Sequence, residues 1–225
     1  SPGGAPRKLI SDVDTKVSFA PGGQEFTFGR GMPQIQESAI FIASADGTNE
    51  RKIAARKFPG SFLSTPVWSP DGKTTATIVK TGIAQGEEHF LIGIDLASGE
   101  QKPIGQKMWN WHREITWMPD GSELLVNMQE KTGDPHQIWR VDYPSGEVLN
   151  VTNDFNDYRG VSMTADGSLV TVKNTLTANL FVAPFEKLEN ARQLTFVEGI
   201  SFYGLSWTPD ARIVYSSNSG GKRDI

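Results

Sequence analysis

The sequence predicts an all-β protein, a β-propeller of four-stranded antiparallel blades, with about four complete blades and a partial blade at each end. A turn motif recurs along the chain, and its aligned positions are Pro21, Pro70, Pro119, Ala165 and Pro209. These positions are 49, 49, 46 and 44 residues apart, and periods of about 40–50 residues are typical of propeller blades. No segment keeps apolar residues at helical spacing over three turns, so no helix is predicted.

Each copy of the motif predicts a strand, a tight turn and a second strand. In the copy at residues 67–72, Pro70 restricts φ, Asp71 bonds to the nearby backbone, and Gly72 takes the positive φ that closes the turn. A third apolar strand and a short fourth strand follow, which completes an antiparallel blade. Within one propeller domain or fragment spanning 1–225, the complete blades are expected at about 11–53, 62–104, 113–152 and 158–195, and the partial blades at 1–10 and 203–225.

The two ends of the chain are expected to lie inside repeats. Arg7 to Ile10 resembles the fourth strand of a blade whose other strands are missing, and Lys222 to Ile225 resembles the start of a third strand. The chain is therefore either a fragment of a larger propeller, which we favour, or a ring in which the two ends share a fifth blade. An open arc would expose strand edges and apolar surface, so self-association through those edges is expected.

A column of large side chains recurs on the first strand of each repeat. Aromatic and apolar side chains at one repeat position indicate packing between neighbouring blades more often than a ligand surface. We therefore expect the residues of this column to be buried. The column consists of Phe19, Trp68, Trp117, Met163 and Trp207.

Composition excludes several classes of function. The net charge is −4 and the pI is near 5.4, and Lys and Arg are scattered, so no nucleic-acid partner is expected. No segment approaches the ~20 apolar residues that cross a bilayer, so no direct membrane insertion is expected. The chain has no cysteine, which excludes disulfides, thiolate catalysis and cysteine-ligated zinc.

No catalytic residue, metal site or cofactor is predicted. No Gly-x-Ser-x-Gly motif occurs, so the nucleophile elbow of an α/β-hydrolase is absent from the sequence. His89 and His136 hold matching repeat positions, and His112 precedes a first strand. A repeat position that tolerates a polar residue explains His89 and His136 better than a metal site shared by the three histidines. The oxygen-rich loop 153–157 lacks the Gly and distal Glu of a calcium loop, which favours a solvated turn.

The rim of the propeller is the expected binding surface. Loops that enter each first strand gather at one mouth of the channel, together with loops that join second and third strands. Two tryptophans in the polar loop 108–113 either contact a partner or fold back over the blade. The candidate ligand-binding residues are Trp109, Trp111, His112, Arg113, Tyr158, Arg159, Phe202 and Tyr203.

The repeats also resemble a known family. The Trp-Ser-Pro-Asp-Gly hairpins and the Asp-Leu-Ala-Ser-Gly-Glu turn at residues 95–100 are similar to repeats of TolB-like and WD-repeat-like propellers over essentially the whole chain. Segments 153–167 and 205–225 resemble propeller regions attached to bacterial serine/threonine kinases and related signalling proteins. The sequence departs from the pattern at Gly22, Ala165 and Ala211, which loosens three turns. The resemblance implies an extracytoplasmic sensor or protein-binding domain, in the periplasm or at the cell surface, with a cytoplasmic location left open.

The expected function is therefore that of a non-enzymatic propeller. It would bind or sense a protein, peptide or small ligand as part of a larger bacterial signalling or envelope protein, with a protein or peptide as the favoured partner. Two alternatives remain: the non-catalytic gating propeller of a prolyl-oligopeptidase-like peptidase, or a structural scaffold for assembly.

Overall fold

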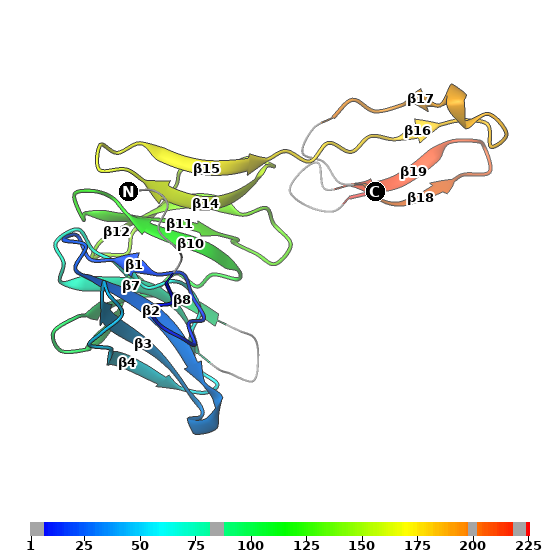
Figure 1. The fold of residues 1–225 in the computed structure, drawn as a ribbon. Helices are drawn as coiled ribbons and strands as arrows, with labels where there is room; N and C mark the ends of the chain where they lie inside the picture. The colour runs from blue at the N-terminus through cyan, green and yellow to red at the C-terminus, as the bar shows by residue number, and fades with distance from the viewer. Residues whose placement is uncertain (1–6, 82–87, 198–201, 218–223) are drawn as a thin grey trace. The chain divides into compact units, whose positions relative to one another are not determined.

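The computed structural model describes residues 7–81, 88–197, 202–217 and 224–225, and its regular structure is almost entirely β (Figure 1). Within these ranges the helical elements are two 3-10 turns, at Pro33–Ile35 and Leu188–Asn190. None of the described helices has the length and apolar character that a membrane-spanning helix needs. The all-β prediction is confirmed.

The chain divides into two compact units, which are described separately. The first contains residues 1–152 and 158–172, and the second contains residues 153–157 and 173–225.

The first unit contains three blades, each an antiparallel sheet whose strands follow chain order (Figure 1). Blade 1 consists of β1 (Ser18–Phe19), β2 (Glu25–Met32), β3 (Glu37–Ser44) and β4 (Arg51–Lys57). Blade 2 consists of β5 (Ser61–Phe62), β6 (Val67–Trp68), β7 (Thr74–Thr81), β8 (Glu88–Asp95) and β9 (Gln101–Pro103). Blade 3 consists of β10 (His112–Trp117), β11 (Glu123–Met128), β12 (Gln137–Asp142) and β13 (Val148–Asn150).

The remaining strands form three two-stranded sheets. They are β14 (Asp157–Met163) with β15 (Leu169–Asn174), β16 (Phe181–Val182) with β17 (Arg192–Gln193), and β18 (Phe202–Trp207) with β19 (Ile213–Ser217). Over residues 158–195 the structure thus has two separate sheets where the repeat predicts a single blade. The third strand explains the difference, because blades 1–3 have third strands of six to eight residues, whereas β16 has only two.

Blades 2 and 3 share the largest apolar core. Their long central strands are buried along most of their length, and alternate residues of these strands belong to the shared cluster, as expected for sheets that pack face to face. Trp117 joins the two blades directly, because its Nε1–H donates to the Val67 carbonyl at 3.0 Å. Its ring also meets Tyr143 edge-on, with centroids 4.9 Å apart.

The aromatic column is buried only in part. Trp117 is buried, and Trp68 and Met163 are partly covered, whereas Phe19 and Trp207 are exposed. The expectation of uniform burial is wrong at these two positions. Burial of this column depends on a neighbouring sheet on the open side of each strand, and repeat position alone does not supply that neighbour.

The two chain ends differ from the strands that the sequence predicts. Residues 7–10 form no strand, and they pair with no other strand among the described residues. They still lie against the turn after β3, where Arg7 donates to the Asp46 carbonyl at 2.9 Å. At the other end, Asp224 forms an isolated bridge with Ser217, and residues 222–223 lie outside the described residues.

Candidate functional site

The first strand is interrupted at one repeat position in several hairpins. In blade 2 it is split into β5 and β6, which both pair with β7. In β10 the register shifts between His112 and Ile115, and in β18 it shifts between Tyr203 and Leu205. Such bulges bend a strand and redirect the side chains beside them. The interruption therefore places short irregular segments along the inner strands.

In the first unit these segments surround a cavity of about 280 Å³, which we call the inner-strand cavity. Four inner segments contribute to it, one from each of blades 1–3 and one from β14, at closely matching repeat positions. The lining residues are Lys16, Val17, Ser18, Ser64, Thr65, Val67, Arg113, Glu114, Ile115, Val161 and Ser162.

Glu114 links three of the four segments. One oxygen of its carboxylate forms an ion pair with the Lys16 ammonium, and the other accepts the Val161 N–H at 3.3 Å. Lys16 comes from the segment before β1, Glu114 lies on β10, and Val161 lies on β14. The Lys16 pair with Glu114 therefore spans the cavity between blades 1 and 3. Because the Lys16 side chain is largely exposed, the pair contributes only about 0–1 kcal/mol to stability.

Two hydroxyl groups of the cavity, those of Ser18 and Ser64, are engaged in the fold. Ser64 Oγ accepts the Ile78 N–H at 2.9 Å and lies 3.2 Å from Thr77 Oγ1. Ser18 Oγ accepts the Trp68 N–H at 3.0 Å, which joins blades 1 and 2. Among the described residues, no histidine or carboxylate hydrogen-bonds to either serine, so neither has the adjacent base that activates a nucleophile.

The two tryptophans of loop 108–113 lie in different environments. Trp109 is 3% exposed and packs edge-on against Trp139, with ring centroids 5.2 Å apart. The Lys107 ammonium lies 4.7 Å from the Trp109 ring centroid and 3.9 Å from that of Trp139. Trp111 is 54% exposed. The folded-back arrangement therefore describes Trp109, and Trp111 alone presents its ring to solvent.

His112 connects the rim to the cavity. Its Nε2–H donates to the Leu63 carbonyl at 3.1 Å, directly before Ser64 in blade 2. Burial lowers the pKa of His112, and the neighbouring His89 and His136 lower it further, against the Leu63 hydrogen bond that raises it. The imidazole is therefore neutral at neutral pH.

The three histidines gather more closely than the sequence suggests. The rings of His89 and His112 are 5.3 Å apart, and both His89 and His136 are buried. The described part of the chain contains no group of three or more His, Cys, Asp or Glu side chains placed to hold a metal ion.

The other rim candidates lie in different local environments. Arg113 lines the cavity, Tyr158 is buried in a small apolar cluster, and Arg159 is exposed. Phe202 and Tyr203 lie on β18 in the second unit, where Phe202 meets Tyr215 with ring centroids 5.2 Å apart. Of the rim candidates, Arg113 lines the cavity, and Trp111 and His112 directly precede it in the chain.

Sequence reasoning missed Lys16 and Glu114. A signal for them exists, because residues 16, 65, 114 and 160 share one repeat position, five residues before the aligned turn residue. Lys16, Thr65 and Glu114 at this position line the cavity. Turn motifs alone do not indicate which position faces it.

Comparisons with known proteins identify the fold. No family model and no curated protein matches the sequence. Among solved structures, a TolB protein of Agrobacterium tumefaciens matches 75% of this chain at 20% identity and a TM-score of 0.55. TolB from Acinetobacter baumannii matches 92% at 17% identity and a TM-score of 0.55. An oligogalacturonate lyase in complex with manganese matches 87% at 16% identity and a TM-score of 0.56.

The chain is a TolB-like β-propeller in fold. It spans 61%, 49% and 56% of the lengths of these three structures. Because the same architecture occurs here in TolB proteins and in a lyase, the likeness identifies a fold and leaves activity to the site.

Proposed function

We propose that this chain is a non-enzymatic propeller module that binds a protein or peptide partner at the inner-strand cavity and the adjoining rim. The observation that carries the proposal is the cavity itself. Successive repeats contribute matching inner segments to one concavity, with an ion pair across it, and the exposed Trp111 lies two residues before the lining residue Arg113.

The chemistry of the cavity suits an extended peptide segment. At about 280 Å³ it is small for a drug-sized ligand, and its wall combines hydroxyls, charged groups and short apolar side chains. Such a wall can accept one side chain of a bound peptide, while the backbone of the peptide forms hydrogen bonds at the edge of the cavity. Exposed Trp111 adds the kind of aromatic anchor that contributes most in protein interfaces.

The contacts of the two cavity serines and of His112 are structural, which supports a binding role for this surface. Neither Ser18 nor Ser64 has an adjacent base among the described residues, and His112 donates to a backbone carbonyl. We assign the module to a larger bacterial envelope or signalling protein, outside the cytoplasm, because its repeats resemble TolB propellers.

The test is selection with a phage-displayed library of random dodecapeptides on the immobilised protein. Selected peptides are then synthesised, and their affinities are measured by fluorescence anisotropy. We expect Ser162→Trp, which fills the cavity from an exposed position on β14, to weaken binding at least about tenfold, equivalent to about 1.4 kcal/mol. Trp111→Ala should weaken binding several-fold.

The matched control is Leu149→Trp, which places the same side chain at an exposed position on the outer strand β13. This variant should bind like the unchanged protein. The proposal is wrong if the library yields no specific binder, or if the selected peptides bind Ser162→Trp and Leu149→Trp equally well.

A further inference from the structure

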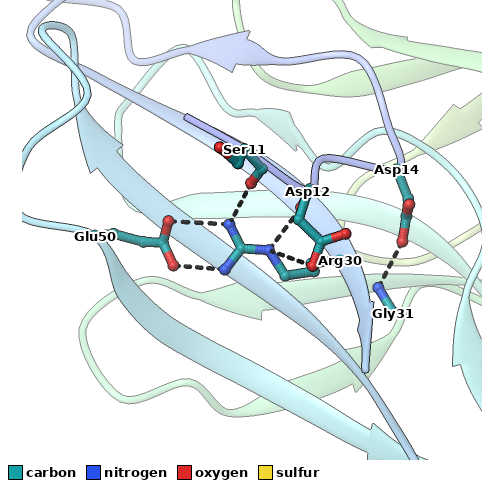
Figure 2. Close-up of polar contacts among 6 residues, drawn as sticks. All are labelled: Ser11, Asp12, Asp14, Arg30, Gly31 and Glu50. Carbon is teal, nitrogen blue, oxygen red and sulfur yellow. Dashed lines mark hydrogen bonds and ion pairs between the residues drawn. The ribbon is translucent and has the colours of Figure 1, made fainter. Parts of the chain in front are cut away.

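A segment before β1 is tied along the edge of blade 1. We call residues 11–16 the strap, and Figure 2 shows its contacts with β2 around Arg30. The strap ends at Lys16, the residue that reaches Glu114 across the inner-strand cavity. The position of this cavity wall therefore depends on how the strap is held.

Arg30 clamps the start of the strap. Its guanidinium donates to the carbonyls of Ser11 and Asp12 at 3.0 and 2.6 Å, and it forms a two-pronged pair with Glu50 at 2.6 and 3.0 Å (Figure 2). The side chain is 14% exposed and lies over the rings of Phe28 and Phe41, 5.2 and 4.6 Å from their centroids. The hydrogen bond with Glu50 holds the pKa of Arg30 above its ordinary value.

The rest of the strap continues along β2 by short hydrogen bonds. The Gly31 N–H donates to Asp14 Oδ2 at 2.7 Å (Figure 2). The Asp14 N–H donates to the Gly29 carbonyl at 3.0 Å. The Gly29 N–H then donates to Thr15 Oγ1 at 2.8 Å. Lys16 is the next residue, so hydrogen bonds follow the chain from the clamp to the edge of the cavity.

The Arg30 clamp is a stronger attachment of the strap than the Lys16 pair with Glu114. An ion pair as exposed as that of Lys16 with Glu114 is weak and is screened by salt. Arg30 makes charge-assisted, two-pronged hydrogen bonds from a largely buried position, which are the stronger kind. The strap therefore positions Lys16, and the Lys16 pair does not hold the strap.

We propose that Arg30 is a positioning residue for the inner-strand cavity: by clamping the strap onto blade 1, it holds Lys16 opposite Glu114. This inference rests on the proposed function of the cavity and names a residue, remote from its lining, that controls binding there. Arg30 touches no partner in this mechanism and acts only through Lys16.

The first test needs no ligand. In protein with ¹³C-dimethylated lysines, the Lys16 signal is assigned by its loss in Lys16→Arg, and Glu114→Gln should shift it because the ion pair is removed. In the Arg30→Gln background, we expect Glu114→Gln to leave that signal unchanged. Amide exchange at Gly31 should rise more than about tenfold in Arg30→Gln.

Matched variants separate positioning from general loss of structure. Arg140→Gln removes an arginine ion pair with Glu123 in blade 3 and should change neither the Lys16 response nor Gly31 exchange. Arg30→Lys keeps the charge without the planar fork, so partial retention of both readouts is expected. If Glu114→Gln shifts the Lys16 signal equally with and without Arg30, the inference fails.

A binding cycle with a peptide selected by the library then tests the consequence. Arg30→Gln should weaken affinity severalfold in the parent protein, and it should have no added effect once Lys16→Ala is present. Additive losses would overturn the positioning role even if peptides bind the cavity. Failure to select any peptide would count against the proposed function alone, because the lysine signals test the strap independently.

Discussion

The hairpins β10–β11 and β18–β19 carry the same Pro-Asp turn motif, and the second loop is one residue shorter than the first. The Gly121 N–H donates to the Met118 carbonyl at 2.9 Å, and the Ala211 N–H donates to the Thr208 carbonyl at 3.0 Å. In both turns an aspartate has a lowered pKa. Backbone and hydroxyl groups of Ser122 bond to Asp120, and the Thr208 hydroxyl bonds to Asp210. Local chemistry is therefore sufficient to form the hairpin.

The environments of the two hairpins differ. Trp117 is 6% exposed and donates to the Val67 carbonyl of blade 2, whereas Trp207 at the same repeat position is 59% exposed. The repeat thus specifies a hairpin with an apolar face, and a neighbouring sheet decides whether that face becomes core. Identical residues have different energetic roles as a result.

The largest expected effect comes from truncating the two tryptophans. Trp117→Ala should destabilise the protein by about 3–5 kcal/mol, because it opens a cavity in the shared core of blades 2 and 3 and leaves the Val67 carbonyl without its donor. Trp207→Ala should change stability by no more than about 0.5 kcal/mol. Urea denaturation followed by circular dichroism measures both values. Equal losses would show that the two hairpins are equally buried in solution.

A smaller effect is expected at the turns. Gly121 and Ala211 hold the same repeat position at φ values of +72° and +63°, and a residue with a Cβ is strained there by about 1 kcal/mol. Ala211→Gly should therefore stabilise β18–β19 by about 0.5–1 kcal/mol, and Gly121→Ala should destabilise β10–β11 by a similar amount. Amide exchange at Thr208 and Met118 reports each turn, and a faster exchange of Thr208 in Ala211→Gly would contradict the argument.

The smallest expected effect is on the pH dependence of stability. It arises at His112, because Phe202 at the same repeat position of β18 carries no titratable group. The folded-state pKa of His112 is lowered from 6.5, mainly by burial. The unfolded chain therefore binds more protons as pH falls through 6.5, so this contribution to stability is present above that value and is lost at lower pH. His112→Phe should reduce the loss of stability between about pH 7.5 and about pH 5.5.

Urea denaturation at both pH values measures that slope. The matched control is Arg140→Gln, whose side chain does not titrate in this range, and its slope should equal that of the unchanged protein. If His112→Phe has the same slope as the unchanged protein, His112 has the same pKa in the folded and unfolded states, and the argument fails.

The sequence by itself determined the strands and turns of the repeat. Proline, aspartate and glycine act on dihedral angles and hydrogen bonds within a few residues, so the hairpin at Pro70, Asp71 and Gly72 forms wherever the motif occurs. The same reasoning proposed Trp109, Trp111, His112 and Arg113 as rim candidates. It left open whether the two tryptophans contact a partner or fold back over the blade.

Only the tertiary structure decided which of these residues meet. The Lys16 pair with Glu114 joins residues 98 positions apart, and Trp109 is buried because Lys107 and Trp139 cover it. Pairing across blades depends on where each first strand is interrupted and on what packs beside it. Burial and long-range contacts depend on the whole assembly of sheets, whereas a turn depends on its own four residues.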